Sequence, residues 1–422
     1  MDEKIASFLK YNFWNGNKVE TGMERPEYTD KIKQYIGNKL IKVLVGQRRA
    51  GKSYILRQIA AQLIKSGVPE SNIFYINKEY IEYDFIDSYA DLQEIYQSYR
   101  REWDPQGKVY LFIDEIQYID GWEKFVNSHS QDFAEPCELF ISGSNSGLLS
   151  GELATLLSGR YVQFEIFPYS FEEFCRATNS ACNRTAYLAY LQSGSLPELF
   201  NLPTEEMKRN YLASVKDTVM LRDIVKRFKV KDIKLLEDIF TLLVNSASTT
   251  VSITNIINFF ASRKRKTNYE TVSSYISYLE SSFLIHKVER YNIRGKETIA
   301  GNCKYYINDQ GFHNYLYAGF GYGIGYQLEN TVFLTLLRAG YSVYTGNIKD
   351  KEVDFVARKA DKVLYLQCTY QLTEQTTIER EYASLEAIED NYEKIVVSLD
   401  EYKLPSKEGI KHVQAWELSA SI

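Results

Sequence analysis

The chain has 422 residues, enough for two or three domains, and its 45% hydrophobic and 25% charged content is typical of a soluble globular protein. Its formal net charge of −5 excludes a general basic field that attracts nucleic acid or a membrane surface, and leaves room only for a local basic patch. Five cysteines without a C-x-x-C pair, four scattered histidines and no membrane-spanning apolar run argue against a disulfide framework, a zinc site and a membrane partner, so we expect a cytoplasmic protein.

The first motif is a phosphate-binding loop. An apolar strand is predicted at residues 41–45, and after it comes Gly46-Gln47-Arg48-Arg49-Ala50-Gly51-Lys52-Ser53, which fits the pattern G-x-x-x-x-G-K-[ST]. The glycines permit a tight turn, so backbone N–H groups can point at phosphate oxygens where the next helix begins. Lys52 is expected to reach the β- and γ-phosphates, and Ser53 to offer its hydroxyl to Mg²⁺. The chain is therefore predicted to bind ATP or GTP, with Tyr54 ending the binding segment.

Further apolar runs alternate with helical patterns and predict an open parallel sheet, which binds ligands at the carboxyl ends of its strands. These strands are predicted at residues 72–77, 108–113, 137–142 and 162–166. Asp114 and Glu115 follow one of these runs directly. By analogy with other phosphate-loop enzymes, Asp114 is predicted to hold Mg²⁺ through water, and Glu115 to orient and activate the attacking water. The alternative is that both carboxylates are simply solvated in a loop.

Polar side chains also end the next strand along the chain. Ser142, Ser144 and Asn145 are candidates for holding the attacking water or for sensing the γ-phosphate, and Asn145 is included among the predicted catalytic residues. Serine and asparagine also favour turns, so a capping role is the alternative. The sequence does not decide between Ser144 and Asn145 as the sensor.

Three arginines are candidates for contacts with phosphate. Arg160 precedes the last predicted strand and is a candidate for stabilising transition-state charge, either in its own subunit or across a subunit boundary. A plain surface arginine is the alternative. Arg48 and Arg49 lie within the loop itself, where one is expected to contact phosphate or a neighbouring subunit and the other to be solvated.

These motifs belong to an ordered series that carries a family resemblance. The series is Arg48-Arg49-Ala50-Gly51-Lys52-Ser53, Phe112-Ile113-Asp114-Glu115-Ile116-Gln117, Ser142-Gly143-Ser144-Asn145-Ser146, Ser158-Gly159-Arg160-Tyr161 and Phe167-Pro168-Tyr169-Ser170-Phe171-Glu172-Glu173-Phe174. It resembles the bacterial and archaeal AAA+ ATPases in which a domain of unknown function follows the nucleotide domain. Downstream markers are Gly194-Ser195-Leu196-Pro197-Glu198, Lys304-Tyr305-Tyr306-Ile307-Asn308-Asp309-Gln310-Gly311 and Glu329-Asn330.

The resemblance covers most of the chain and has specific implications. It implies an AAA+ type ATP-binding core in which Asp114 and Glu115 form the acidic pair, and it supports Arg160 as a candidate arginine finger. It does not supply a substrate.

Helical periodicity dominates after a predicted boundary at residues 201–204. Helices are predicted at residues 215–228, at 233–245, from 252 and from 269 to 284, and a strand at 285–291. Short helix, basic turn, second helix and hairpin resemble a winged helix-turn-helix. Its basic turn, Arg263-Lys264-Arg265-Lys266, is expected to meet DNA phosphates, with Asn268, Thr271 or Ser274 near bases. The alternative is a solvated turn in a winged helix that contacts protein.

The last segment, from about residue 325, has a different pattern. It predicts a helix at 329–339, strands at 341–344, 353–358 and 363–369, a helix at 376–392 and a strand at 394–399. This order resembles the PD-(D/E)-x-K, restriction-endonuclease-like fold, whose active members hold Mg²⁺ with an acid on one strand and acid-x-Lys on the next. Asp354 is the candidate first acid and Glu329 an accessory one. Gln367-Cys368-Thr369 stands where acid-x-Lys is needed, so nuclease activity is not expected.

The sequence thus predicts an α/β protein with three domains: an AAA+ phosphate-loop ATPase domain at 1–200, a helical and winged-helix domain at 201–324, and a degenerate nuclease-like domain at 325–422. The leading hypothesis is an ATPase that uses Mg²⁺ and switches the arrangement of its C-terminal modules. A homo-oligomer and a nucleic-acid partner at Arg263–Lys266 are both considered. The alternatives are a nucleotide-dependent binding protein with negligible turnover, and an Mg²⁺ nuclease.

Overall fold

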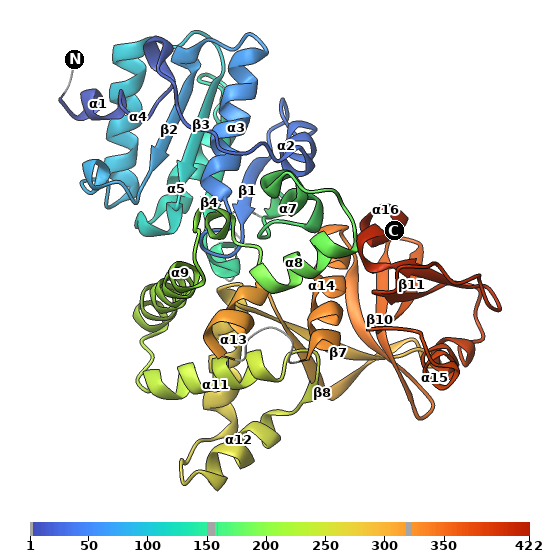
Figure 1. The fold of residues 1–422 in the computed structure, drawn as a ribbon. Helices are drawn as coiled ribbons and strands as arrows, with labels where there is room; N and C mark the ends of the chain where they lie inside the picture. Colours follow the sequence, from blue (N-terminus) through green and yellow to red (C-terminus); the bar gives the residue numbers. More distant parts are fainter. Residues whose placement is uncertain (1–2, 150–156, 158, 318–322) are drawn as a thin grey trace. The chain divides into compact units, whose positions relative to one another are not determined.

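The chain forms two compact units, Met1–Ile166 and Phe167–Ile422 (Figure 1). The computed structural model describes residues 3–149, 157, 159–317 and 323–422. The first boundary therefore lies at Ile166, whereas the sequence placed it after residue 200. Residues 167–200 join the second unit because their aromatic side chains are part of its core. Phe171, Phe174 and Tyr190, for example, are buried in one cluster with Phe333 of a later helix.

The first unit is built on the predicted parallel sheet, with strand order β2-β3-β4-β1-β5. The strands are β1 (Ile41–Val45), β2 (Ile73–Asn77), β3 (Val109–Asp114), β4 (Cys137–Gly143) and β5 (Tyr161–Glu165). All four pairings are parallel, which confirms the prediction drawn from their continuous apolar runs. Because β1 lies between β4 and β5, the loop after β1 emerges inside the sheet rather than at its edge.

Helices cover both faces of this sheet. They are α1 (Glu3–Phe8), α2 (Pro26–Lys33), α3 (Lys52–Lys65), α4 (Tyr89–Trp103) and α5 (Trp122–Gln131). Successive residues of a strand point to opposite faces. Accordingly, Tyr75 packs with Ile55 of α3, whereas Phe74 stacks on Tyr99 of α4 with ring centroids 4.4 Å apart. The strands are therefore buried on both sides, as their sequences require.

The second unit contains one mixed sheet with strand order β13-β12-β11-β10-β9-β7-β8-β6. The strands are β6 (Thr250–Val251), β7 (Ile285–Asn292), β8 (Glu297–Ile307), β9 (Ser342–Ile348), β10 (Lys351–Lys359), β11 (Lys362–Thr369), β12 (Glu393–Ser398) and β13 (Ile410–Gln414). β7 pairs in parallel with β9, where Tyr291 lies opposite Gly346. This pairing closes two strand edges and joins the predicted domains 201–324 and 325–422 into one sheet.

The predicted helices of the second unit occur in the predicted order, but several of their ends differ; α14 (Ile324–Arg338), for example, begins five residues before the predicted start at 329. They are α7 (Phe171–Thr178), α8 (Arg184–Ser193), α9 (Glu205–Thr218), the π-helix Val219–Val225, α10 (Lys226–Phe228), α11 (Ile233–Asn245), α12 (Ile253–Ser262), α13 (Tyr269–Ser281), α14 (Ile324–Arg338) and α15 (Gln375–Glu386). The helix expected at 215–228 already begins at Glu205, because Thr204 caps it by accepting a hydrogen bond from the Met207 N–H. α15 ends six residues early, since Asp390 holds the following turn by accepting from Tyr392 N–H and Tyr365 O–H.

The downstream family markers form buried polar clamps in this unit. Asp309 accepts hydrogen bonds from the Ser195 N–H and hydroxyl, both at 2.7 Å, and from the Gly311 N–H at 2.7 Å. The Asn330 amide bonds both backbone groups of Ile307, each at 2.8 Å. Segments far apart in the sequence are thereby fastened to the end of β8. Within the described part of the chain, no helix is both long and apolar enough to cross a membrane.

Candidate nucleotide-binding site

The phosphate-binding loop runs from the end of β1 to the start of α3, and its two glycines are required by its shape. Gly46 has φ +146°, and a Cβ atom there would collide with the carbonyl oxygen of Ile166. Gly51 has φ +99° and is the residue before α3. A residue with a side chain is strained at φ values in this range. The loop is therefore bent tightly against the chain after β5, and it ends at a helix N-terminus.

Lys52 lies inside the curve of this loop. Its Nζ donates to the carbonyl oxygens of Gly46 at 3.0 Å and Gln47 at 3.1 Å, and lies 3.9 Å from Glu115 Oε1. Ser53 is half-buried, and its hydroxyl has no hydrogen-bond partner among the described residues. The structure thus brings an ammonium, an available hydroxyl and a carboxylate to the carboxyl ends of β1 and β3.

Asp114 is held rigidly at the end of β3. Its Oδ2 accepts hydrogen bonds from Tyr75 O–H at 2.8 Å and Asn77 Nδ2 at 3.1 Å, and its Oδ1 accepts from the Ser142 hydroxyl. Burial raises the pKa of Tyr75 well above its ordinary value. Sequence reasoning missed Tyr75 and Asn77 as partners. Asn77 is a polar residue at the end of a buried strand, and that signal would have found it.

Glu115 is buried in an unusual backbone conformation. Its φ of 56° and ψ of 45° are left-handed, a region that non-glycine residues rarely adopt. Its N–H donates to Ser142 Oγ at 3.1 Å, and its Oε2 accepts from Gln117 Nε2 at 2.6 Å. Burial raises the pKa of the Glu115 carboxyl, and the nearby Lys52 charge opposes that rise. The Glu115 carboxylate is therefore buried and hydrogen-bonded, which argues against the alternative that it is solvated in a loop.

The residues that follow β4 lie near Glu115, to which the Gln117 side chain connects them. Ser144 Oγ accepts from Gln117 Nε2 at 3.3 Å, and Asn145 Oδ1 accepts from Gly147 N–H at 2.6 Å. Asn145 Nδ2 is buried and has no partner among the described residues. One end of the Asn145 amide therefore caps a turn, whereas its other end is a buried donor suited to a phosphate oxygen or a water molecule.

The two loop arginines differ in their surroundings. Arg48 is buried, pairs with Glu79 and reaches Tyr118 O–H at 3.5 Å. Arg49 has φ 70° and is exposed, with no partner among the residues that the structure describes. Arg49 is therefore the arginine of this pair that is available to a phosphate or a neighbouring subunit.

Arg160 lies at the opposite end of the sheet. Its carbonyl oxygen accepts a hydrogen bond from the N–H of Ile41, the first residue of β1, and its Nη1 donates to Asn127 of α5 at 2.6 Å. A strand of five residues is about 16 Å long. The exposed guanidinium is thus far from the loop of its own chain, which leaves the role across a subunit boundary and the plain surface role.

The segment before α2 supports the loop. Arg25 is buried and donates from Nη1 to the carbonyl oxygen of Ala50 at 2.7 Å. Tyr54 is partly exposed, Gly22 lies directly against its ring, and Arg57 stacks over that ring at 4.2 Å. Sequence reasoning missed Arg25, because no local pattern shows that a distant arginine reaches this carbonyl.

The donor set fits a nucleoside triphosphate with Mg²⁺. The loop offers backbone N–H groups and the Lys52 ammonium to phosphate oxygens. The Ser53 hydroxyl and the Asp114 carboxylate are oxygen donors of the kind that Mg²⁺ prefers. The buried and unpartnered Asn145 Nδ2 supplies a further hydrogen bond to an anion or to water.

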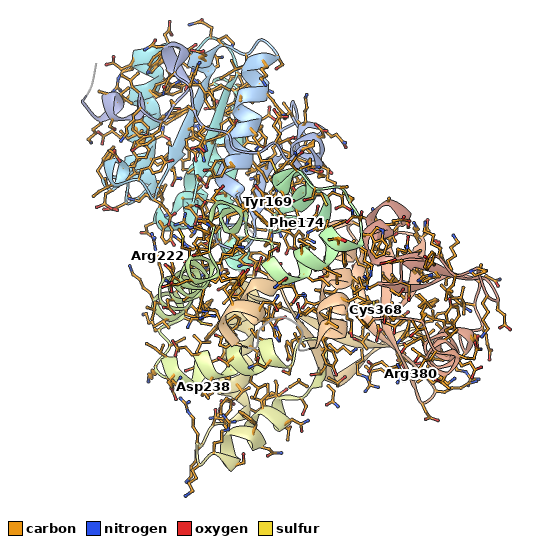
Figure 2. All side chains as sticks on the ribbon, viewed as in Figure 1. Tyr169, Phe174, Arg222, Asp238, Cys368 and Arg380 are labelled. Atoms are coloured by element: carbon orange, nitrogen blue, oxygen red, sulfur yellow. The ribbon has the colours of Figure 1, made fainter. Side chains whose placement is uncertain are left out.

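The basic turn of the second unit is only partly free. Arg265 forms ion pairs with Asp232 and with Asp238, which is labelled in Figure 2, so the expectation that Arg265 meets DNA phosphates is corrected. Arg263 stacks on the Phe259 ring at 4.1 Å. Lys264 and Lys266 are exposed and form no ion pair with any described residue. Asn268 caps α13 by accepting from the Thr271 N–H at 2.8 Å.

A buried lysine of β8 contacts the candidate acids of the predicted nuclease-like domain, although the lysine itself lies outside residues 325–422. Lys304 Nζ lies 2.9 Å from Glu329 Oε1, 2.8 Å from Glu352 Oε1 and 3.8 Å from Asp354 Oδ1. Burial raises the pKa of Asp354 and of Glu329. Asp354 Oδ2 also accepts from the N–H of Cys368, labelled in Figure 2, at 2.8 Å. No group of three or more His, Cys, Asp or Glu within the described residues could hold a metal ion.

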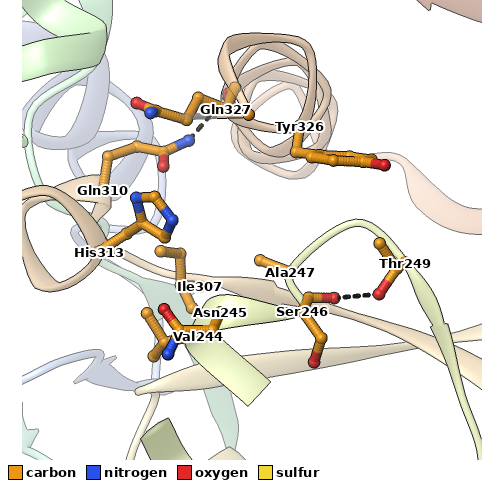
Figure 3. Close-up of a pocket in the computed structure, with 11 residues that line it drawn as sticks. Val244, Asn245, Ser246, Ala247, Thr249, Ile307, Gln310, His313, Tyr326 and Gln327 are labelled. Atoms are coloured by element: carbon orange, nitrogen blue, oxygen red, sulfur yellow. Dashed lines mark hydrogen bonds between the residues drawn. The ribbon is translucent and has the colours of Figure 1, made fainter. Parts of the chain in front are cut away.

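A cavity of about 200 Å³ lies elsewhere in the second unit (Figure 3). Polar side chains line much of it, among them Asn245, Gln310, His313 and Gln327. Gln310 Nε2 donates to the carbonyl oxygen of Gln327 at 2.8 Å, across one wall. The cavity contains none of the predicted site residues.

Two family models match this chain. Residues 38–175 match the family described as an AAA domain, and residues 184–322 match a domain of unknown function, DUF8612. A protein of Haemophilus influenzae described as uncharacterized is 38% identical over 402 residues, which cover 94% of this chain and 98% of that protein. An uncharacterized protein of Methanocaldococcus jannaschii is 33% identical over 373 residues, covering 84% of this chain and 80% of that protein. A Walker-type ATPase of Pyrococcus abyssi superposes with a TM-score of 0.46 at 14% identity, covering 68% of this chain and 94% of the other.

Proposed function

The chain belongs to the protein family that includes these relatives from H. influenzae and M. jannaschii, and from this premise we propose that its AAA domain binds ATP with Mg²⁺ and hydrolyses it. The bent loop, the start of α3 and Lys52 bind the triphosphate. Ser53 and Asp114 hold the metal ion, which supplies positive charge near the phosphates when it is bound. The rigid bonding of Asp114 to three neighbours fixes its carboxylate for that purpose.

Glu115 accepts a proton from the attacking water in this proposal. Its carboxylate lies 3.9 Å from the Lys52 ammonium, so the base and the phosphate-binding cation both lie at the carboxyl ends of the strands. A buried carboxylate with a raised pKa is a stronger base than a solvated one. This juxtaposition of Lys52 and Glu115 is the observation that carries the proposal.

Steady-state phosphate release tests the hydrolysis. We expect the wild type to release phosphate from ATP, Glu115→Gln to bind ATP without releasing phosphate, and Lys52→Ala to lose binding. Glu94→Gln changes an exposed carboxylate of α4 and serves as the control. GTP is assayed in parallel to determine the purine preference.

Equal inertness of the wild type and Glu115→Gln, with every nucleic acid and oligomer tried, would overturn the ATPase proposal. Tight nucleotide binding that depends on Lys52 would then support the second candidate, a nucleotide-dependent binding protein.

The second unit is proposed to carry the modules that respond to nucleotide. The order α11, β6, α12, α13, β7, β8 supports a winged helix, and the order α14, β9, β10, β11, α15, β12 supports a restriction-endonuclease-like fold. Lys304 satisfies the carboxylates of the latter, so this part is proposed to lack nuclease activity. Plasmid cleavage that is lost in Asp354→Ala would contradict this.

The exposed lysines of the winged helix are proposed to contact DNA phosphates. Fluorescence anisotropy with duplex DNA tests this at several salt concentrations. Each phosphate contact contributes about 0.9 to the slope of log K against log salt, so Lys264→Ala with Lys266→Ala is expected to lower the slope by about 2. Lys349→Ala, an exposed lysine between β9 and β10, is the control. An unchanged slope would favour protein contacts instead.

A further inference from the structure

Gln117 lies between the candidate base and the end of β4. It belongs to the short helical turn Ile116–Tyr118 that follows β3. Its Nε2 donates to Glu115 Oε2 at 2.6 Å and lies 3.3 Å from Ser144 Oγ. One amide therefore bridges a carboxylate at the end of β3 and a hydroxyl at the end of β4.

Gly143 makes room for this amide. A Cβ atom on Gly143 would lie 2.7 Å from Gln117 Oε1, closer than a real side chain allows. The backbone of Gly143 is not in the positive-φ region, so conformational freedom does not explain the glycine. The space that a side chain would fill is taken by the Gln117 amide, which is thus seated against β4.

Two buried polar atoms beside this bridge are unpartnered among the described residues. They are Gln117 Oε1 and Asn145 Nδ2. Buried polar groups in proteins are nearly always hydrogen-bonded, so such atoms mark a place where a ligand or a water molecule completes the bonding. Within the described part of the chain, the amide that binds Glu115 therefore has a free acceptor, and Asn145, the residue after Ser144, has a free donor.

Gln117 also fixes the direction of the Glu115 carboxylate. Lys52 lies on the Oε1 side at 3.9 Å, and the Gln117 amide lies on Oε2. The hydrogen bond to Oε2 and the ammonium near Oε1 together restrict the rotation of this carboxylate. A one-ångström displacement of a catalytic group costs about 100-fold in rate, so the orientation of this side chain matters for hydrolysis.

We propose that Gln117 is a positioning residue that holds the Glu115 carboxylate at a fixed position relative to Ser144 and Asn145 at the end of β4. Contacts of the γ-phosphate with the end of β4 are thereby transmitted through one amide to the base. This inference rests on the proposed function, in which Glu115 acts on the attacking water.

The test separates turnover from nucleotide binding. Gln117→Leu retains the volume of the side chain and removes both hydrogen bonds. We expect its kcat for phosphate release to fall about 10- to 100-fold, with KM and the dissociation constant of a fluorescent ATP analogue unchanged within about twofold. Gln131→Leu, an exposed glutamine at the end of α5, is expected to behave as the wild type.

Two further variants keep the test independent of folding. Gly143→Ala leaves Gln117 and Glu115 intact, displaces the amide from its seat, and is expected to reproduce the kcat loss. Gln117→Glu preserves the shape, places a second carboxylate beside Glu115, and is expected to lose at least as much kcat as Gln117→Leu.

The outcomes distinguish the two proposals. Phosphate release by the wild type, together with an unchanged kcat in both Gln117→Leu and Gly143→Ala, would overturn the positioning role and leave the ATPase proposal standing. A parallel rise in KM and in the dissociation constant would also overturn it, because it would assign Gln117 to binding. No release by the wild type would overturn the ATPase proposal and this inference with it.

Discussion

At the residue scale, the ends of β2, β3 and β4 show how one buried charge is fixed by neutral partners. Asp114 receives three hydrogen bonds, from Tyr75, Asn77 and Ser142. All three donors are neutral groups, so the Asp114 side chain is fixed without a charged partner. The same chemistry repeats one residue later, where Gln117 donates to Glu115. The candidate site is thus an ordered polar network in the ends of apolar strands.

A pH-dependent stability is expected from Glu165, which ends β5 next to the loop. Burial raises the pKa of its carboxyl to about 7. Between the ordinary value of 4.5 and about 7, the folded chain keeps a proton that the unfolded chain releases, so stability falls as pH rises through this range. Glu165→Gln is therefore expected to raise the free energy of unfolding by about 1 to 3 kcal/mol at pH 8, and by nothing at pH 4.

Urea denaturation at the two pH values measures this effect. Glu94→Gln, on the exposed face of α4, is the control and is expected to change neither value. An equal gain in the free energy of unfolding of Glu165→Gln at both pH values would contradict the assignment of this pH dependence to Glu165, because it would reflect packing rather than titration.

Lys304 provides a second test at the same scale. Removing it by Lys304→Met leaves buried carboxylates without their cation, and this is expected to lower the free energy of unfolding by about 3 to 5 kcal/mol. Glu352→Gln removes the partner whose side chain is 47% exposed, and is expected to cost less than about 1 kcal/mol. Thermal and urea denaturation of the two variants would show the contrast, and equal losses would contradict the assigned burial.

At the scale of elements, the second unit is held together by polar clamps as well as by apolar packing. α14 is fastened to the end of β8 through Asn330, and the turn before the short helix Pro197–Asn201 is fastened to Asp309. Backbone groups at strand and helix ends need partners when they are buried. The short polar motifs at residues 194–198, 304–311 and 329–330 thus have a structural role in this unit.

Asn330→Ala is expected to destabilise the protein by about 2 to 4 kcal/mol, because it leaves the buried N–H and C=O of Ile307 unpaired. Asn330→Asp retains the acceptor for the N–H and loses the donor, so an intermediate loss is expected. Denaturant titration measures both. Asn302→Ala is the control, because Asn302 is an exposed asparagine of β8, the strand that contains Ile307. A loss of stability as large in Asn302→Ala would contradict the clamping role of Asn330.

At the scale of the whole molecule, the position of Arg160 predicts a requirement for assembly. If the exposed guanidinium completes the site of a neighbouring subunit, Arg160→Ala and Lys52→Ala are each expected to lower phosphate release by about 100-fold or more. Mixing the two variants is expected to restore part of the activity, because the Lys52→Ala subunit still supplies Arg160. Mixing Arg160→Ala with the double variant is the control and restores nothing. Full activity of Arg160→Ala alone would show that Arg160 has no role in hydrolysis and is a plain surface arginine.

Nucleotide-dependent rearrangement is expected to be visible in solution. Small-angle scattering of Glu115→Gln, which retains ATP, is expected to give a different pair-distance distribution with ATP and Mg²⁺ than without. Lys52→Ala is expected to give the same distribution in both conditions. Identical distributions for Glu115→Gln would contradict a switch that repositions the two units.

The sequence by itself determined the features that depend on local pattern. Continuous apolar runs identified the strands of the parallel sheet, because the burial of a strand depends on the residues of that strand. The spacing of Gly46, Gly51 and Lys52 identified the loop, because its backbone geometry depends on these neighbouring residues. Helix ends were less well predicted, since capping at Thr204 and the turn at Asp390 depend on individual side chains. The roles assigned to the site residues stay predictions.

Only the tertiary structure decided which distant residues meet. It paired β7 with β9, placed Lys304 among three acids, tied Arg265 to Asp232 and Asp238, and put Arg160 at the far end of β1 from the loop. It also seated Gln117 against Gly143. These contacts join segments far apart along the chain, and their free energy depends on burial and distance in the folded state, which no local pattern of residues records.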